Sequence, residues 1–130
     1  MPSNGSMLSH REQEAGLELA EQFVEDRARA VLAMSLASYA LDVPLTSVPT
    51  RRDVRAALAR QVAMYVAHVV FGMSMERVGA AFGRDRSTVS YACRAMEDRR
   101  DDARFDRWID ALERSAQAAP APFEGARNEA

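Results

Sequence analysis

Apolar residues recur every three or four positions through most of this chain, a spacing typical of amphipathic α-helices. Between Arg11 and about Leu41, glutamates crowd the first turns, where the positive end of a helix dipole favours them. The pattern leaves open whether this region forms one helix or two. We expect its apolar stripe to face the core. The stripe consists of Leu17, Ala20, Val24, Ala28, Val31 and Ser35, widened by Phe23, Leu32, Met34 and Tyr39.

Four more helical segments follow a connector that carries two prolines, Asp42 to Pro49. Thr50 as N-cap, with Asp53 three residues later, predicts a helix from Arg51 to about Val70. Its expected inward residues are Val54, Leu58, Val62, Tyr65, Val66 and Val69.

The remaining helices are predicted from their caps and from their spacing. Ser74 would cap a short helix, Met75 to Phe82, that Gly83 ends. Asp85 or Ser87 would cap the next helix, which runs to about Arg99. A last amphipathic helix, 101 to about 115, presents four large apolar residues, Phe105, Trp108, Ile109 and Leu112.

The predicted organisation is a single all-α domain over residues 11–115, in a chain of 130 residues. It comprises an acidic N-terminal region (11–41), a core (51–99) and a C-terminal helix (101–115). Residues 1–10 are polar, and residues 116–130 are rich in alanine and proline. We expect both ends to be disordered.

The stretch from Met73 to Ala95 has the order of a helix-turn-helix: a short helix, a glycine turn and a second helix that opens with polar residues. Small Gly79 and Ala80 would let the two helices cross closely. The second helix would bury Val89, Ala92, Cys93 and Met96 and leave its N-terminal face free for DNA bases. That face carries Arg84, Asp85, Arg86, Ser87, Thr88 and Tyr91. A generic helical hairpin is the alternative.

Charge is distributed unevenly along the chain, although the net charge is only −2. Residues 51–100 hold ten arginines against five acidic residues, whereas the rest holds seven arginines and fourteen acidic residues. Such a contrast indicates a basic working surface beside an acidic flank. The acidic N-terminal helix is either a solvated face or a surface for docking or dimerisation.

Other chemistry finds little support in the sequence. Cys93 is the one cysteine, His10 and His68 are the two histidines, and no set of residues suits a metal site or a catalytic centre. No apolar run is long enough to cross a membrane, and no secretory signal is evident. We therefore expect a cytoplasmic, nucleoid-associated protein that is not an enzyme and carries no cofactor.

The segment ARQVAMYVAHVVFGMSMERVGAAFGRDRSTVSYACRAMEDRR resembles the C-terminal DNA-binding domain of the bacterial replication initiator DnaA. The likeness includes Ala59–Gln61, Met64–Tyr65, Phe82–Asp85, Thr88–Val89 and Tyr91–Cys93, and it extends over roughly residues 30–113. It implies a Trp-repressor/DnaA-type helix-turn-helix bundle with an added N-terminal helix. The initiator's ATPase domain requires a Gly-rich phosphate loop that contains a lysine. The chain has no lysine and therefore no such loop.

The resemblance also implies roles for individual residues. Arg60 would reach into the minor groove, and Arg51, Arg52 and Arg55 would lie near phosphates. Arg84, Asp85, Ser87 and Thr88 would address bases and phosphates of the major groove. The predicted DNA-binding residues also include Ser74, Arg86 and Tyr91. Two departures put recognition of the initiator's usual DNA box in doubt. One glycine of the family's double glycine is missing before Arg84, and Arg86–Ser87 replaces histidine and threonine.

Three hypotheses remain after this reading. The first is a sequence-specific regulator of transcription that binds double-stranded DNA and acts with a sigma-like factor or RNA polymerase; the chain resembles the DnaA-like subunit of gene-transfer-agent activators. The second is a replication-control factor that competes at initiator boxes. The third is a protein-interaction adaptor without DNA affinity. A homodimer through the N-terminal helix is compatible with each of them.

Overall fold

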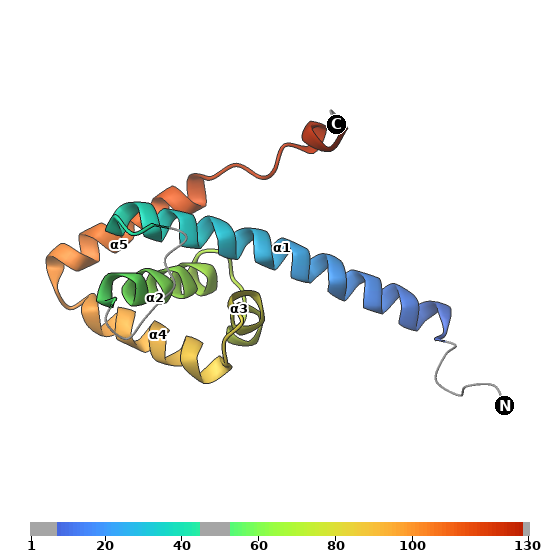
Figure 1. The fold of residues 1–130 in the computed structure, drawn as a ribbon, viewed down its shortest axis with the longest axis horizontal. Coiled ribbons are helices and arrows are strands. Elements are labelled where there is room, and N and C mark those ends of the chain that lie inside the picture. The colour runs from blue at the N-terminus through green and yellow to red at the C-terminus, as the bar shows by residue number, and fades with distance from the viewer. Residues whose placement is uncertain (1–7, 45–52, 129–130) are drawn as a thin grey trace.

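The computed structural model describes residues 8–44 and 53–128, and these form five α-helices, a short 3₁₀ helix and no strand (Figure 1). The all-α prediction is therefore confirmed. Three residues with predicted roles lie outside the described residues: Thr50, the predicted N-cap, and Arg51 and Arg52, predicted to lie near phosphates. The elements are α1 (His10–Leu41), α2 (Val54–Val69), α3 (Met75–Phe82), α4 (Arg86–Arg99), α5 (Ala103–Ala118) and η1 (Glu124–Asn128).

The N-terminal region is one continuous helix, which settles the question that the pattern left open. A capping box begins it: the Ser9 hydroxyl accepts the Glu12 N–H at 3.1 Å, and the Glu12 carboxylate accepts the Ser9 N–H at 2.9 Å. His10, expected in a disordered end, is the first residue of this helix.

Two other boundaries differ from the prediction. Helix α2 begins at Val54 because Asp53, rather than Thr50, is its N-cap: the Asp53 carboxylate accepts the Ala56 N–H at 2.9 Å. Helix α5 continues to Ala118, since Ala116 still packs on the core, and η1 lies within the segment expected to be disordered.

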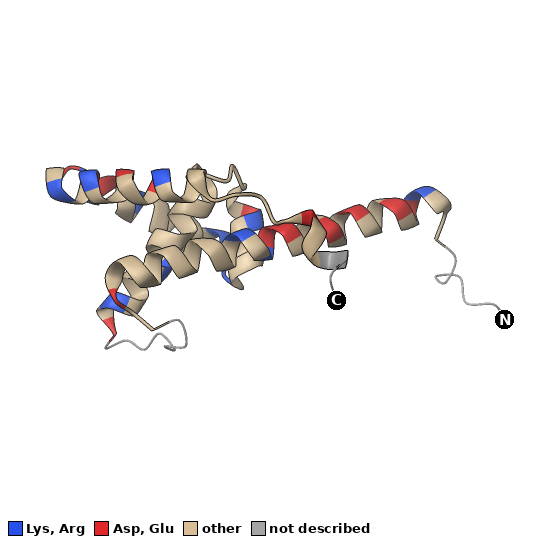
Figure 2. Cartoon of the chain, turned by 90° about the horizontal axis from the view of Figure 1, so that it is seen from above, with Lys and Arg blue, Asp and Glu red and all other residues tan. Residues whose placement is uncertain are grey.

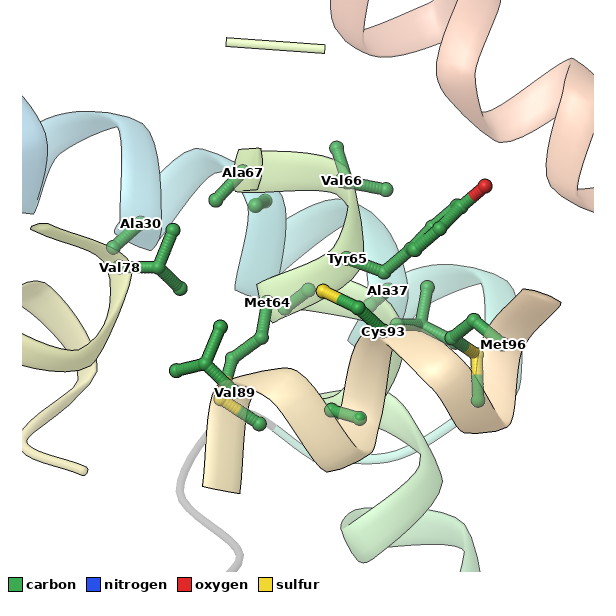
Figure 3. Close-up of a cluster of buried hydrophobic side chains, with 14 of the residues drawn as sticks. Ala30, Ala37, Met64, Tyr65, Val66, Ala67, Val78, Val89, Cys93 and Met96 are labelled. Carbon is green, nitrogen blue, oxygen red and sulfur yellow. The ribbon is translucent and has the colours of Figure 1, made fainter. Parts of the chain in front are cut away.

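The core surrounds α2, whose residues 62–67 are all buried (Figure 3). This stretch is apolar on every side because other helices cover it; α1 and α4 pack directly on α2. Val54 and Val69 were expected to point inward, but 71% and 46% of their surfaces are exposed. Both lie at the ends of α2, beyond the part that the other helices cover.

The packed face of α1 is not the predicted stripe. Leu17, Val24 and Val31 are each more than half exposed, and Tyr39 is 89% exposed. The buried residues of α1 are Asp26, Ala30, Ala33, Ala37 and Ser38. Alanine side chains allow two helices to approach closely, so α1 meets α2 chiefly through its small residues. Met34, Leu36 and Leu41 of its second half are partly buried beside them.

An ion pair fastens α1 to the helix-turn-helix. Asp26, with a side chain 4% exposed, accepts two hydrogen bonds from the Arg77 guanidinium of α3, at 2.9 Å from Nε and 2.7 Å from Nη2. These bonds lower the pKa of Asp26, against the opposing effect of burial. Arg27 of α1 also donates to the Ala81 carbonyl at 2.5 Å.

Arg100 joins the end of α4 to α5. Its guanidinium donates to Asp106 and Glu113 at 2.6 Å each, and also to Asp110. Burial opposes the charged form, but these carboxylates outweigh it, so the pKa of Arg100 is raised. A further bond of 3.1 Å reaches the Tyr65 hydroxyl of α2. The C-terminal helix is thus tied to the core by charge as well as by apolar packing.

Candidate nucleic-acid interface

The turn between α3 and α4 depends on two glycines. Gly83 ends α3 with a left-handed φ of 67°, which glycine adopts without strain. The Arg84 N–H donates to the Gly79 carbonyl at 2.8 Å, and a Cβ added at Gly79 would lie 2.6 Å from the Arg84 carbonyl oxygen. Gly79 therefore permits the close return of the chain, whereas Ala80, predicted to help the crossing, is exposed.

Helix α4 separates a buried side from an exposed side as the sequence predicts. Val89, Ala92, Cys93 and Met96 are buried. The candidate DNA-contacting residues at its N-terminal end are all exposed, and the structure brings them together: Arg84, Asp85, Arg86, Ser87, Thr88 and Tyr91.

The carboxylate of Asp85 is not used to cap α4. Asp85 occupies the N-cap position, and its main-chain carbonyl accepts the Thr88 N–H at 3.1 Å, but its side chain makes no capping hydrogen bond. N-cap aspartates ordinarily satisfy the free N–H groups of the first turn. The Asp85 side chain and the N–H groups of Arg86 and Ser87, which no described residue accepts, thus remain available to an external partner.

Arg60 lies on α2, at the edge of this surface. Its Nη1 is buried, and no described residue accepts a hydrogen bond from it. Burial lowers the pKa of Arg60, and the positive charge of Arg84 lowers it further. No described carboxylate pairs with this guanidinium and a second arginine lies near it, so a bound anion would be favourable here.

The other predicted contacts are less concentrated. Arg55 is exposed in the first turn of α2. The Ser74 hydroxyl accepts the Arg77 N–H at 3.2 Å and so caps α3, which uses one of its hydrogen-bonding positions. The DNA contacts assigned to these residues remain predictions.

One candidate was missed. Arg94 is exposed on α4, three residues after Tyr91 and seven after Ser87, so all three lie on the same side of the helix. The sequence-based expectation stopped at Tyr91 because the resemblance emphasised the N-terminal end of the helix. The i, i+4, i+7 spacing from Ser87 alone would have found Arg94.

The remaining chemically notable residues have structural roles. His68 Nδ1 lies 2.7 Å from the Met73 carbonyl oxygen, within the loop before α3. Cys93 is buried, which raises the pKa of its thiol. Phe105 and Trp108 pack on the core with ring centroids 5.5 Å apart. Among the described residues no group of side chains could hold a metal ion, and no helix could span a membrane.

Comparisons with known proteins agree with this geometry. Residues 48–96 match the family described as the bacterial dnaA protein helix-turn-helix. This segment is therefore similar to the helix-turn-helix of DnaA. The match contains α3, its glycine turn and most of α4, together with α2 and Arg60.

The similar proteins are much longer than this chain. The chromosomal replication initiator protein DnaA 2 of Chlamydia muridarum is 48% identical over 50 residues, which cover 38% of this chain and 11% of that protein. DnaA of Lactococcus lactis is 36% identical over 69 residues, 52% of this chain and 15% of the relative. The chain therefore spans only a small part of the curated relatives it matches.

Solved structures extend the DnaA-type likeness beyond the matched segment. A replication initiator DnaA bound to AMPPCP and single-stranded DNA aligns with a TM-score of 0.64 and 26% identity, over 79% of this chain and 31% of that one. A DNA replication initiation factor aligns with a TM-score of 0.65 over 86% of this chain and 38% of the other. At 23% identity, the second likeness shows the fold alone.

Proposed function

We propose that this protein is a regulator of transcription that binds double-stranded DNA at specific sequences through its DnaA-type helix-turn-helix. The observation that carries the proposal is the Arg60 guanidinium, buried at Nη1 without a described acceptor and close enough to Arg84 for their charges to interact. A phosphate or a base edge would supply the missing acceptor.

The start of α4 adds to this surface. Its free N–H groups and the dipole of the helix favour negative charge, and exposed Arg84 and Arg86 lie at the same end. Ser87 and Thr88 can donate to or accept from bases and phosphates. Helix α4 would then lie in the major groove while Arg60 approaches the adjacent backbone or minor groove.

The regulator would act together with a protein partner. The candidates are a sigma-like factor, RNA polymerase and a second copy of this chain, and the exposed side of α1 is the surface left for them. In this function the protein is nucleoid-associated and acts by binding rather than by catalysis. Activation through such a partner would fit the resemblance to gene-transfer-agent activator subunits.

Selection of binding sites from a pool of random duplexes, followed by fluorescence anisotropy on the selected site, tests the proposal. We expect a defined sequence and an affinity that falls steeply with salt, by about 0.9 logarithmic units per phosphate for each tenfold rise. Arg86→Ala should relax the sequence preference, whereas Arg107→Ala, an exposed arginine on α5, should not. Equal affinity for all duplexes would contradict sequence-specific regulation.

The same assay separates transcriptional regulation from replication control. Arg86 stands where the DnaA family has histidine, so we expect the initiator's own box to be bound more weakly than the selected site. Arg86→His should reduce that difference. Tight binding of the unaltered protein to the initiator box would instead support competition at origins. No binding at low salt would leave the adaptor hypothesis.

A further inference from the structure

The first half of α1 extends away from the rest of the protein as an arm (Figures 1 and 2). Every residue from His10 to Glu25 is exposed except the half-buried Gln22. An isolated helix of this length is only marginally stable in water. Yet the arm carries large apolar residues, among them Leu17, 61% exposed, and Val24, 62% exposed.

The exposed apolar residues form a seam of the kind that pairs helices. Leu17, Val24 and Val31 follow one another at intervals of seven residues, with Ala20 and Ala28 between them. At 3.6 residues per turn this seam lies on the side of α1 opposite the alanines that pack on α2. A helix docked on the seam would therefore not compete with the core.

We propose that the seam pairs with the same seam of a second copy, in the antiparallel direction. Its residues are arranged symmetrically about Val24: Ala20 and Ala28 lie four residues to either side, and Leu17 and Val31 lie seven. Antiparallel pairing centred on Val24 therefore places Leu17 against Val31 and alanine against alanine. Both copies use one surface, as a twofold interface requires.

Charge also favours the antiparallel direction. Residues 10–25 carry five glutamates and one arginine, whereas the part of α1 that follows carries Arg27 and Arg29 beside Asp26 (Figure 2). Parallel pairing would align the two acidic arms along their whole length. Antiparallel pairing instead places each acidic arm beside the arginine-bearing half of the other helix.

A hollow lies beside the seam, where the arm of a second copy would pass. It has a volume of about 560 Å³ and lies between α1, the two residues after α2, the end of α5 and the segment Ala119–Pro122 that follows α5. Its described wall is mainly apolar, with Ala28 and Leu32 from α1, and Arg29 is its only charged residue. The acidic arm of a second copy, extending past Val24, would run alongside this opening.

Sedimentation of the full chain without DNA tests the pairing independently of the proposed function. We expect a dimer, and Val24→Glu should raise its dissociation constant at least about tenfold, because two unpaired carboxylates would meet at the twofold axis. Leu19→Glu is the matched control: Leu19 is 72% exposed but lies off the seam, so this variant should still dimerise. A monomer at every concentration, or a dimer that tolerates Val24→Glu, would overturn the proposal.

Disulfide trapping tests the direction. In a chain with Cys93→Ala, Leu17→Cys is mixed with Val31→Cys under mild oxidation. Antiparallel pairing gives the mixed disulfide, whereas parallel pairing gives only disulfides between identical variants. The second result would overturn the antiparallel arrangement. Antiparallel pairing further predicts, if the proposed DNA binding holds, that the selected site contains two inverted half-sites.

Discussion

Arginine has opposite uses at the two ends of α4. At the N-terminal end, Arg84 and Arg86 are exposed and make no ion pair with any described residue, and nearby Arg60 has no acceptor for Nη1. At the C-terminal end, Arg100 is held by three carboxylates of α5. Arginines thus lie exposed and unpaired at one end of α4, whereas at the other end an arginine stabilises the fold.

The helix dipole makes this contrast informative. Positive side chains stabilise the C-terminal end of a helix and destabilise the N-terminal end, by about 0.3–1 kcal/mol each. Arg100 therefore lies where the fold favours it, whereas Arg86 lies where the fold disfavours it. Arginines kept in an unfavourable place without carboxylate partners are better explained by an external anion than by stability.

The largest expected effect is at Arg60. Arg60→Ala should reduce affinity for the selected duplex by about 1–3 kcal/mol, roughly fivefold to over a hundredfold, because the half-buried guanidinium would lose its contact with DNA. Thermal unfolding without DNA should change little, since Arg60 Nη1 has no described partner to lose. Anisotropy and calorimetry on the same preparation measure both. Unchanged affinity would show that Arg60, unlike Arg84 and Arg86, is not available to bind DNA.

Arg100 should show the reverse behaviour. Arg100→Met should lower the free energy of unfolding by about 2 kcal/mol, a value reduced from that of a fully buried network because Asp106 and Asp110 are 41% and 44% exposed. Denaturant unfolding measures the loss. Arg107→Met, at an exposed arginine of α5, should cost much less. Below the melting range, DNA affinity of the Arg100 variant should be retained.

The pair of Asp26 and Arg77 extends the comparison to pH. The folded-state pKa of Asp26 is lowered, chiefly by hydrogen bonds from Arg77, so its contribution is present above the ordinary pKa of about 3.8 and is lost as the pH falls through the folded value. Asp26→Asn should cost about 1 kcal/mol at neutral pH. It should also flatten the loss of stability below about pH 4, as acid titration followed by circular dichroism would show. An equally steep acid limb in the variant would contradict this account.

The sequence predicted the helices and the division of α4 into a buried and an exposed side well, because both depend on local rules. Ser74 and Gly83 bound α3, and the spacing of Val89, Cys93 and Met96 defines the buried side of α4. The exposed candidates follow from the same spacing. These features are fixed by residues close in the chain.

Features that depend on distant residues were not predicted. An apolar stripe shows that a helix face suits burial, but not what covers it, so Leu17 and Val24 were wrongly assigned to the core. Asp26 is buried because Arg77, 51 residues away, pairs with it. The unfavourable charge environment of Arg60 likewise comes from its nearness to Arg84. That nearness follows from how α2 and the turn pack together, which local sequence patterns do not give.

The smallest expected effect is at Arg94, which tests how far along α4 the arginines available to DNA extend. It lies on the side of α4 that carries Ser87 and Tyr91, but two turns beyond the N-terminal end, where a side chain meets phosphate more readily than base edges. Arg94→Ala should weaken binding to all duplexes alike, by less than about 1 kcal/mol, and reduce the salt slope by about one. Arg114→Ala, an exposed arginine on α5, is the matched control and should leave the slope unchanged. A loss confined to the selected sequence would show that Arg94 reads bases, and that the reading surface extends further along α4 than its N-terminal turn.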